Sequence, residues 1–206
     1  DYEKSIIVKN YKAEENINKI LNHSKNIVGV GGWDSLEQLF YVMNATTEYV
    51  VLRNFENLPA KYNSDEHGDI DFLVKDLSEI IFITSAEKVF DEEDRVYFKI
   101  KIAGTDVFVD FRYVGDNYYD ETWQRNILKN KELTQRGFFV PTNEDYFYSL
   151  IYHCLFHKFN IASDYPHKIK NIYSKLEIYN DKNCYFSNYF LLLEKFLSDN
   201  SYQVIK

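Results

Sequence analysis

Two aspartates separated by one residue stand out in the segment 68–74, which reads Gly-Asp-Ile-Asp-Phe-Leu-Val. Side chains alternate along a β-strand, so Asp69 and Asp71 are expected on one face. Two carboxylates held side by side repel each other, and a hard divalent cation is their usual partner. Asp110, inside the apolar run 107–111, is expected to add a third carboxylate from a neighbouring strand. Such a set can hold Mg²⁺ or Mn²⁺ and clamp the oxygens of a phosphoryl transfer.

An arginine follows the third acid at the spacing that keeps both on one face of a strand. Arg112 lies two residues after Asp110, so it is expected either to pair with that acid or to reach a substrate phosphate. An acid in the middle of an apolar strand is costly to bury without such a partner. The alternative interpretation is an ordinary strand whose acids face solvent.

The apolar pattern predicts a mixed α/β half over residues 1–117, followed by a helical region over residues 118–206. Residues 103–105 read Ala-Gly-Thr between two β-type runs, which predicts a hairpin. Capping residues at 34–35 and 142 predict the starts of two helices. The predicted strands are 48–52, 69–74, 96–102 and 106–114, and the other predicted helices are 13–23, 166–179 and 186–197. The segment 77–90 fits a helix or a strand.

Composition narrows the class of protein. The chain has 206 residues, 45% of them hydrophobic and 17% aromatic, which is enough for a packed core. A net charge of -8 disfavours a general nucleic-acid binder, since those carry a basic surface. The two cysteines indicate no disulfide framework, no apolar stretch is long enough for a membrane span, and no signal peptide is visible. We therefore expect a cytoplasmic protein with no membrane partner.

The order of these features resembles the nucleotidyltransferase superfamily of DNA polymerase β and the aminoglycoside nucleotidyltransferases. Within it, the chain looks most like the small bacterial nucleotidyltransferase-like proteins, over residues 49–114. The resemblance implies an α+β fold with a nucleotidyltransferase-like mixed β-sheet and flanking helices, followed by a helical C-terminal half. It implies that Asp69 and Asp71 are the paired metal ligands. It implies that Asp110 is the third carboxylate, which also helps to activate the attacking hydroxyl.

The chain departs from the family pattern at the phosphate-binding turn. The family has a Gly-Gly or Gly-Ser turn shortly before the paired acids, whereas residues 51–54 read Val-Leu-Arg-Asn. We expect Arg53 and Arg112 to bind the outer phosphates in place of that turn, because the planar guanidinium suits phosphate oxygens. Arg53→Ala would then weaken nucleotide binding and leave folding intact. Asn54 and Gly68 are further predicted substrate-binding residues, and the pair at 31–32 is the next candidate for the turn.

The predicted function is the transfer of a nucleoside monophosphate from a nucleoside triphosphate to a hydroxyl of a small molecule or protein. This is a nucleotidyltransferase activity of the EC 2.7.7 type. One alternative is a degenerate nucleotidyltransferase fold that acts as a binding or regulatory module. Another is a transferase that uses a different phosphate-linked donor in surface polysaccharide synthesis. Mg²⁺-dependent stabilisation by nucleotides would separate an active site from a degenerate one.

Two groups of residues in the helical half have competing interpretations. His153 and His157 share a helix face, so they form either a packed or hydrogen-bonded pair or part of a zinc site. We favour the packed pair, because the sequence offers no third ligand. Tyr118, Tyr119 and Trp123 are expected to pack in the core, and stacking of a base or sugar is the alternative.

Overall fold

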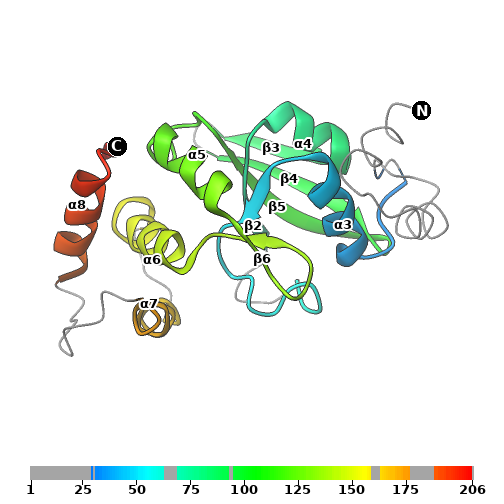
Figure 1. Cartoon of the computed structure of the whole chain (residues 1–206). Helices are drawn as coiled ribbons and strands as arrows, with labels where there is room; N and C mark the ends of the chain where they lie inside the picture. The colour runs from blue at the N-terminus through cyan, green and yellow to red at the C-terminus, as the bar shows by residue number, and fades with distance from the viewer. Residues whose placement is uncertain are drawn as a thin grey trace.

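The computed structural model describes residue 29 and residues 31–62, 69–92, 95–158, 163–176 and 188–205. The helix predicted at 13–23, and Gly68 among the predicted site residues, lie outside the described residues. Figure 1 shows a β-sheet with two helices on one side and the C-terminal helices beyond its other side. The fold is α+β, with a five-stranded mixed sheet followed by a mostly helical C-terminal region.

The sheet has the strand order β1-β2-β5-β4-β3. Its strands are β1 (Tyr49–Val51), β2 (Asp69–Val74), β3 (Glu87–Glu92), β4 (Arg95–Ile102) and β5 (Thr105–Tyr113). Strands β2 and β5 pair in parallel, and every other neighbouring pair is antiparallel. The predicted strands 48–52, 69–74, 96–102 and 106–114 are confirmed within one or two residues. The ambiguous segment 77–90 divides into a helix and β3.

One face of the sheet packs against α3 (Leu36–Thr46) and α4 (Leu77–Thr84). The helix α3 begins where the sequence predicts, because the hydroxyl of Ser35 accepts a hydrogen bond from the backbone N–H of Gln38. Alternate strand residues supply this side of the core, namely Ile70, Phe72, Val74, Val107, Val109 and Phe111. The opposite alternation leaves Asp71 and Asp110 for the other face.

The second face of the sheet is on the side of the C-terminal helices, which extend away from it to the left in Figure 1. These are α5 (Glu121–Asn130), α6 (Asn143–Tyr152), the π-helix η1 (His153–His157), α7 (Tyr165–Tyr173) and α8 (Tyr189–Asp199). Strand residues Val50, Leu52 and Leu73 belong to the same buried cluster as these helices. The prediction of a purely helical region needs one correction: residues 132–133 and 139–140 form a short two-stranded hairpin, β6–β7.

Local backbone geometry explains two further boundaries. Ala103 and Gly104 have φ values of 49° and 78°, so both occupy the left-handed region that a tight hairpin between β4 and β5 requires. Thr142 caps α6, because its hydroxyl accepts a hydrogen bond from the backbone N–H of Asp145 at 3.1 Å. Both boundaries agree with the sequence predictions.

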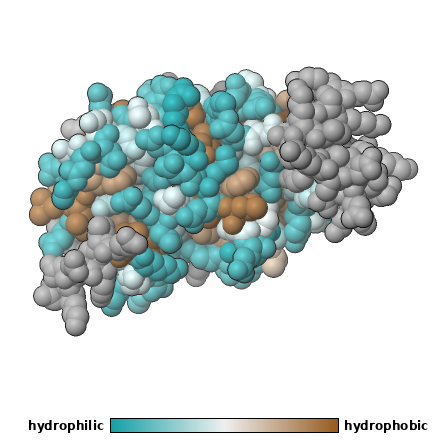
Figure 2. All heavy atoms as spheres, viewed as in Figure 1, coloured by the Kyte–Doolittle hydropathy of each residue, from teal (hydrophilic) through white to brown (hydrophobic). Residues whose placement is uncertain are grey.

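The surface in Figure 2 is largely hydrophilic and is interrupted by a few apolar areas, one of them at the position of α8. The exposed side chains Phe190 and Leu191 of α8 contribute to the apolar surface. Within the part of the chain that the structure describes, no helix combines the length and the apolar character needed to cross a bilayer.

Candidate active site

The parallel pairing of β2 and β5 brings two of the predicted acids together. Asp71 and Asp110 are direct register partners, and both side chains point to the face beneath the C-terminal helices. They are 5% and 4% exposed. Asp69 is opposite Phe108 in the same register and is partly exposed at the start of β2. The structure therefore juxtaposes Asp71 and Asp110 deep in the molecule and leaves Asp69 closer to solvent.

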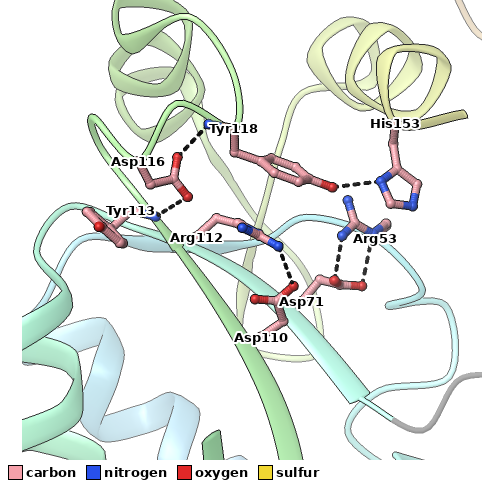
Figure 3. Close-up of polar contacts among 8 residues, drawn as sticks. All are labelled: Arg53, Asp71, Asp110, Arg112, Tyr113, Asp116, Tyr118 and His153. Carbon is pink, nitrogen blue, oxygen red and sulfur yellow. Dashed lines mark hydrogen bonds and ion pairs between the residues drawn. The ribbon is translucent and has the colours of Figure 1, made fainter. Parts of the chain in front are cut away.

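Arg53 forms a buried, bidentate ion pair with Asp71 (Figure 3). Its Nε donates to Oδ2 at 2.9 Å and its Nη2 donates to Oδ1 at 2.5 Å. The backbone N–H of Leu52 donates to the carbonyl of Asp71, which extends the β1–β2 pairing and delivers Arg53 to this position. Burial alone would lower the pKa of Arg53, but the Asp71 carboxylate holds that pKa well above its ordinary value.

Arg112 forms the second ion pair of the site, with its Nη2 3.2 Å from Oδ2 of Asp110. Burial raises the pKa of Asp110, and the nearby Arg112 opposes that rise. The two aspartates thus stand side by side with one arginine on each (Figure 3). Of the two outcomes expected for Arg112, the pairing with Asp110 is the one observed. Because Arg53 neutralises a buried carboxylate, the structure leads us to expect that Arg53→Ala also affects folding, which the sequence did not predict.

Two of the three predicted metal ligands, Asp71 and Asp110, form ion pairs with arginines in the structure. Their carboxylate oxygens are the donors that Mg²⁺ and Mn²⁺ prefer, so the donor chemistry of Asp69, Asp71 and Asp110 fits such an ion. In the structure, guanidinium groups hold the cation positions next to Asp71 and Asp110. No group of three His, Cys, Asp or Glu side chains within the described residues is arranged to hold a metal. Binding a metal here would require these two carboxylates to exchange their arginines for it.

Tyr118 connects the arginines to the helical half. The guanidinium carbon of Arg112 lies 4.2 Å from the centre of the Tyr118 ring, and that of Arg53 lies 5.8 Å from it. The ring of His157 stacks on Tyr118 at 4.0 Å between centroids. Core packing is confirmed for Tyr118, which is 8% exposed, but its contacts also place it in the site. The sequence gives no local signal for this second role.

The hydroxyl of Tyr118 lies 2.6 Å from Nδ1 of His153 (Figure 3). Burial first, and then the charge of Arg53, hold the pKa of His153 far below its ordinary value, so its ring is neutral. Burial raises the pKa of the Tyr118 hydroxyl, which therefore keeps its proton. The Tyr118 hydroxyl serves as the donor if the proton of the imidazole is on Nε2. His153 and His157 thus form a packed, hydrogen-bonded group around Tyr118, as we favoured over a zinc site.

Three buried nitrogen atoms around Tyr118 have no hydrogen-bond partner among the described residues. They are Nε of Arg112, Nε2 of His153 and Nδ1 of His157. An unsatisfied buried polar atom costs about 1–3 kcal/mol. The two histidines belong to η1, and short π-helical segments often mark functional positions. This part of the molecule therefore retains polar groups at a cost in stability.

The lowered pKa values of His153 and His157 predict that the folded protein loses stability in mild acid. Burial, followed by the charges of Arg53 and Arg112, lowers the pKa of His157 to about 4, and the pKa of His153 is also lowered. The unfolded chain therefore binds more protons than the folded chain below pH about 6.5. Stability is fully present above that pH and falls as the pH drops towards 4, by at most about 1.4 kcal/mol per pH unit for each histidine. The effect of the partly buried His157 is the smaller one.

Urea denaturation at several pH values between 7.5 and 4.5 measures this loss. His153→Phe should flatten the dependence of the unfolding free energy on pH. His167→Gln is the matched control, because His167 is exposed on α7, and it should leave the dependence unchanged. A His153→Phe variant with the wild-type pH dependence would contradict the assignment.

The two segments proposed for the phosphate-binding turn, 53–54 and 31–32, lie next to different strands of the sheet: the first follows β1 and the second lies near the end of β4. Asn54 directly follows Arg53 and has φ 58°, the left-handed conformation that glycine adopts most easily and asparagine tolerates. Gly32 instead packs against Lys101 near the end of β4, and the neighbouring Trp33 bridges to Ile102. The turn after β1 thus has glycine-like backbone geometry without a glycine, whereas Gly32 of the pair at 31–32 packs at the end of β4.

A cavity of about 450 Å³ adjoins Asp69. Asn54 and Asp69 contribute to its lining, together with the loop after β1, the segment that precedes α6, and α7. Lys168 of α7 fixes one wall, because its Nζ donates to Oδ1 of Asn54 at 2.7 Å and pairs with Asp164. Sequence reasoning identified Asn54 and Asp69 but missed the lining residues of the helical half. Comparison with known proteins adds no assignment: the chain matches no protein-family model, no curated protein and no solved structure.

Proposed function

We propose that this chain is a metal-dependent nucleotidyltransferase, which moves a nucleoside monophosphate from a nucleoside triphosphate to a hydroxyl of a small molecule or protein. One observation carries the proposal: Asp71 and Asp110 face each other on neighbouring parallel strands, with Asp69 two residues upstream at the edge of a cavity. Burying two adjacent carboxylates is costly, which argues for a functional reason to keep them. The order of the acids along the chain, a pair followed by a third on a later strand, is the pattern on which the sequence resemblance rests.

The turn after β1 supports the proposal. The sequence lacks the glycine of the family's phosphate-binding turn, but Asn54 takes up a positive φ at that point. A turn of this kind can present backbone N–H groups to a phosphate. Arg53, immediately before it, carries a charge that suits phosphate oxygens once it is released from Asp71.

The residues divide into metal ligands and phosphate ligands. Asp69, Asp71 and Asp110 would hold Mg²⁺ or Mn²⁺, which when bound offsets phosphate charge and polarises the phosphoryl oxygens. Arg53 and Arg112 neutralise the acids in the structure described here. We propose that they turn to the triphosphate when it binds. The C-terminal helices above them exclude water from the acids, since Asp71 and Asp110 are nearly inaccessible.

The second candidate function is a nucleotidyltransferase-like module that binds a nucleotide without catalysing its transfer. The bidentate contact of Arg53 with Asp71 favours it, because both oxygens of one predicted metal ligand are occupied. Such a pair is stable in itself and needs no metal. The two functions differ in whether the arginines leave the acids when nucleotide and metal arrive.

Thermal unfolding in the presence of nucleotides tests the proposal. Each nucleoside triphosphate, added with Mg²⁺, should raise the Tm if it binds, and EDTA should abolish the rise. Asp110→Asn should also abolish it. Asp106→Asn is the matched control on the same strand, because Asp106 is exposed and pairs only with Lys99 among the described residues, so this variant should respond like the wild type.

Release of pyrophosphate then separates transfer from binding. An active enzyme, given the nucleotide that stabilises it and an acceptor, should release pyrophosphate in a Mg²⁺-dependent reaction that Asp110→Asn lacks. Metal-independent nucleotide binding without release would favour the binding module. The absence of any nucleotide-dependent change in Tm would contradict both functions.

A further inference from the structure

The cavity beside Asp69 lies between the two halves of the molecule. It is bounded by the loop after β1, the start of β2, the segment before α6, and α7, and its volume of about 450 Å³ is in the usual range for small-molecule sites. Asp69 is the predicted catalytic acid that lines it, while Asp71 and Asp110 lie deeper. Of the three predicted acids, a molecule in the cavity would therefore meet Asp69 first.

The charges of the lining argue against a polyanion in this cavity. Three lysines and four acids line it: Lys61, Lys168, Lys175, Glu56, Asp69, Glu132 and Asp164. Lys168 is already engaged by Asn54 and Asp164, so part of the positive charge is neutralised within the wall. A triphosphate would meet more carboxylates than ammonium groups here and would be repelled. The two arginines on Asp71 and Asp110 are the better position for its phosphates.

The amide side chains of the lining suit hydroxyl groups. Asn143 and Asn171 each carry an amide that both donates and accepts hydrogen bonds, and Asn54 adds an amide N–H₂ donor, since its oxygen already accepts from Lys168. The carboxylates add acceptors and the lysines add donors. A hydroxyl group donates one hydrogen bond and accepts others, so a molecule with many hydroxyls matches this mixture better than a purely anionic or apolar one.

An aromatic wall completes the cavity. The rings of Phe55 and Tyr146 lie 4.7 Å apart between centroids, and both side chains line the cavity. The hydroxyl of Tyr146 donates to Oε1 of Glu56 at 3.0 Å, which fixes that carboxylate beside the rings. Aromatic rings next to fixed polar groups are suited to a ligand ring whose two faces carry C–H groups and whose edge carries hydroxyls.

We propose that this cavity holds the acceptor, and that the acceptor is a polyhydroxylated small molecule of the sugar or polyol class with little net charge. The inference rests on the proposed function. An acceptor hydroxyl oxygen would form the new bond to the α-phosphorus, while the bond from that phosphorus to the bridging oxygen breaks. Pyrophosphate leaves with the electron pair of the broken bond, and the hydroxyl proton passes to an aspartate carboxylate of the site and then to water.

Ligand-observed NMR with a panel of hexoses, pentoses and sugar alcohols tests the inference. Asn171→Trp would fill the cavity from the exposed side of α7, and Lys170→Trp is the matched control on the same helix, at an exposed residue outside the lining. We expect at least one member of the panel to bind the wild type and the control alike, and to bind Asn171→Trp at least about tenfold more weakly, equivalent to about 1.4 kcal/mol. Nucleotide with Mg²⁺ should bind all three proteins.

Three results would overturn the inference. They are binding of no panel member, binding that is undiminished in Asn171→Trp, and loss of nucleotide binding in Asn171→Trp, which would assign the cavity to the nucleotide instead. The proposed function fails separately, if nucleotide and Mg²⁺ bind none of the three proteins whatever the panel does. Parallel measurement of both ligands therefore distinguishes the two failures.

Discussion

Replacing Arg53 with methionine is expected to lower the free energy of unfolding by about 3–5 kcal/mol, the usual effect of removing one partner from a buried ion pair. The reason is that Asp71, only 5% exposed, would keep a carboxylate that no guanidinium neutralises. Urea denaturation at neutral pH, followed by circular dichroism, measures the change. This loss is a large fraction of a typical domain's stability, which is about 5–15 kcal/mol.

Two further variants identify the cause of that loss. Arg53→Met combined with Asp71→Leu should recover much of the stability, because the unpaired charge is gone. Arg125→Met is the matched control, since Arg125 pairs with Glu121 one helical turn away and both side chains are more than half exposed. Its loss should stay below about 1 kcal/mol. Equal losses for Arg53→Met and Arg125→Met would show that the buried pair does not support the fold.

Replacing Trp123 with alanine is expected to lower the free energy of unfolding by about 3–5 kcal/mol, the range for truncating a buried aromatic side chain. Trp123 is fully buried between α5 and the other C-terminal helices, where its ring lies 5.3 Å from that of Phe196. Its Nε1 also donates to Oδ1 of the buried Asp145 at 2.9 Å. The core interpretation of Trp123 is thus confirmed, with a hydrogen bond in addition.

The two contributions of Trp123 can be separated by unfolding experiments. Trp123→Phe keeps most of the ring and removes the donor to Asp145, so it should cost about 1–3 kcal/mol, the penalty for an unsatisfied buried polar group. Thr142 still bonds to the same carboxylate and moderates this cost. If Trp123→Phe proved as destabilising as Trp123→Ala, the hydrogen bond rather than the packing would dominate.

The strands and their faces could be predicted from the sequence because they depend on local alternation. The apolar residues on either side of Asp71 and Asp110 fix the sides to which these acids point, and the short segment at 103–105 fixes the hairpin. The helix starts at 36 and 143 followed from the capping residues at 35 and 142, whose effect extends over only three positions. In each case the physical cause lies within a few residues of its effect.

The contacts of Arg53 and Tyr118 could not be predicted in this way. The partner of Arg53 depends on how β1 aligns with β2, across a loop that the sequence pattern leaves undefined. The sequence predicts Tyr118 as a core residue, and it is buried. Its hydroxyl, however, forms a hydrogen bond with a histidine 35 residues later in the chain. Only the packing of the helical half on the sheet creates that contact. The positive φ of Asn54 likewise follows from the turn and not from its residue type alone.

The parallel pairing of β2 with β5 has a consequence for how quickly the chain refolds. Antiparallel neighbours such as β4 and β5 need only a tight turn, whereas β2 and β5 become partners across α4, β3 and β4. Pairings between distant segments form slowly because loop closure precedes the contacts that reward it. The hairpin β4–β5 is therefore expected to form early, and docking of β5 against β2 late. Asp71 and Asp110 would then meet only near the end of folding, after most of the sheet has formed.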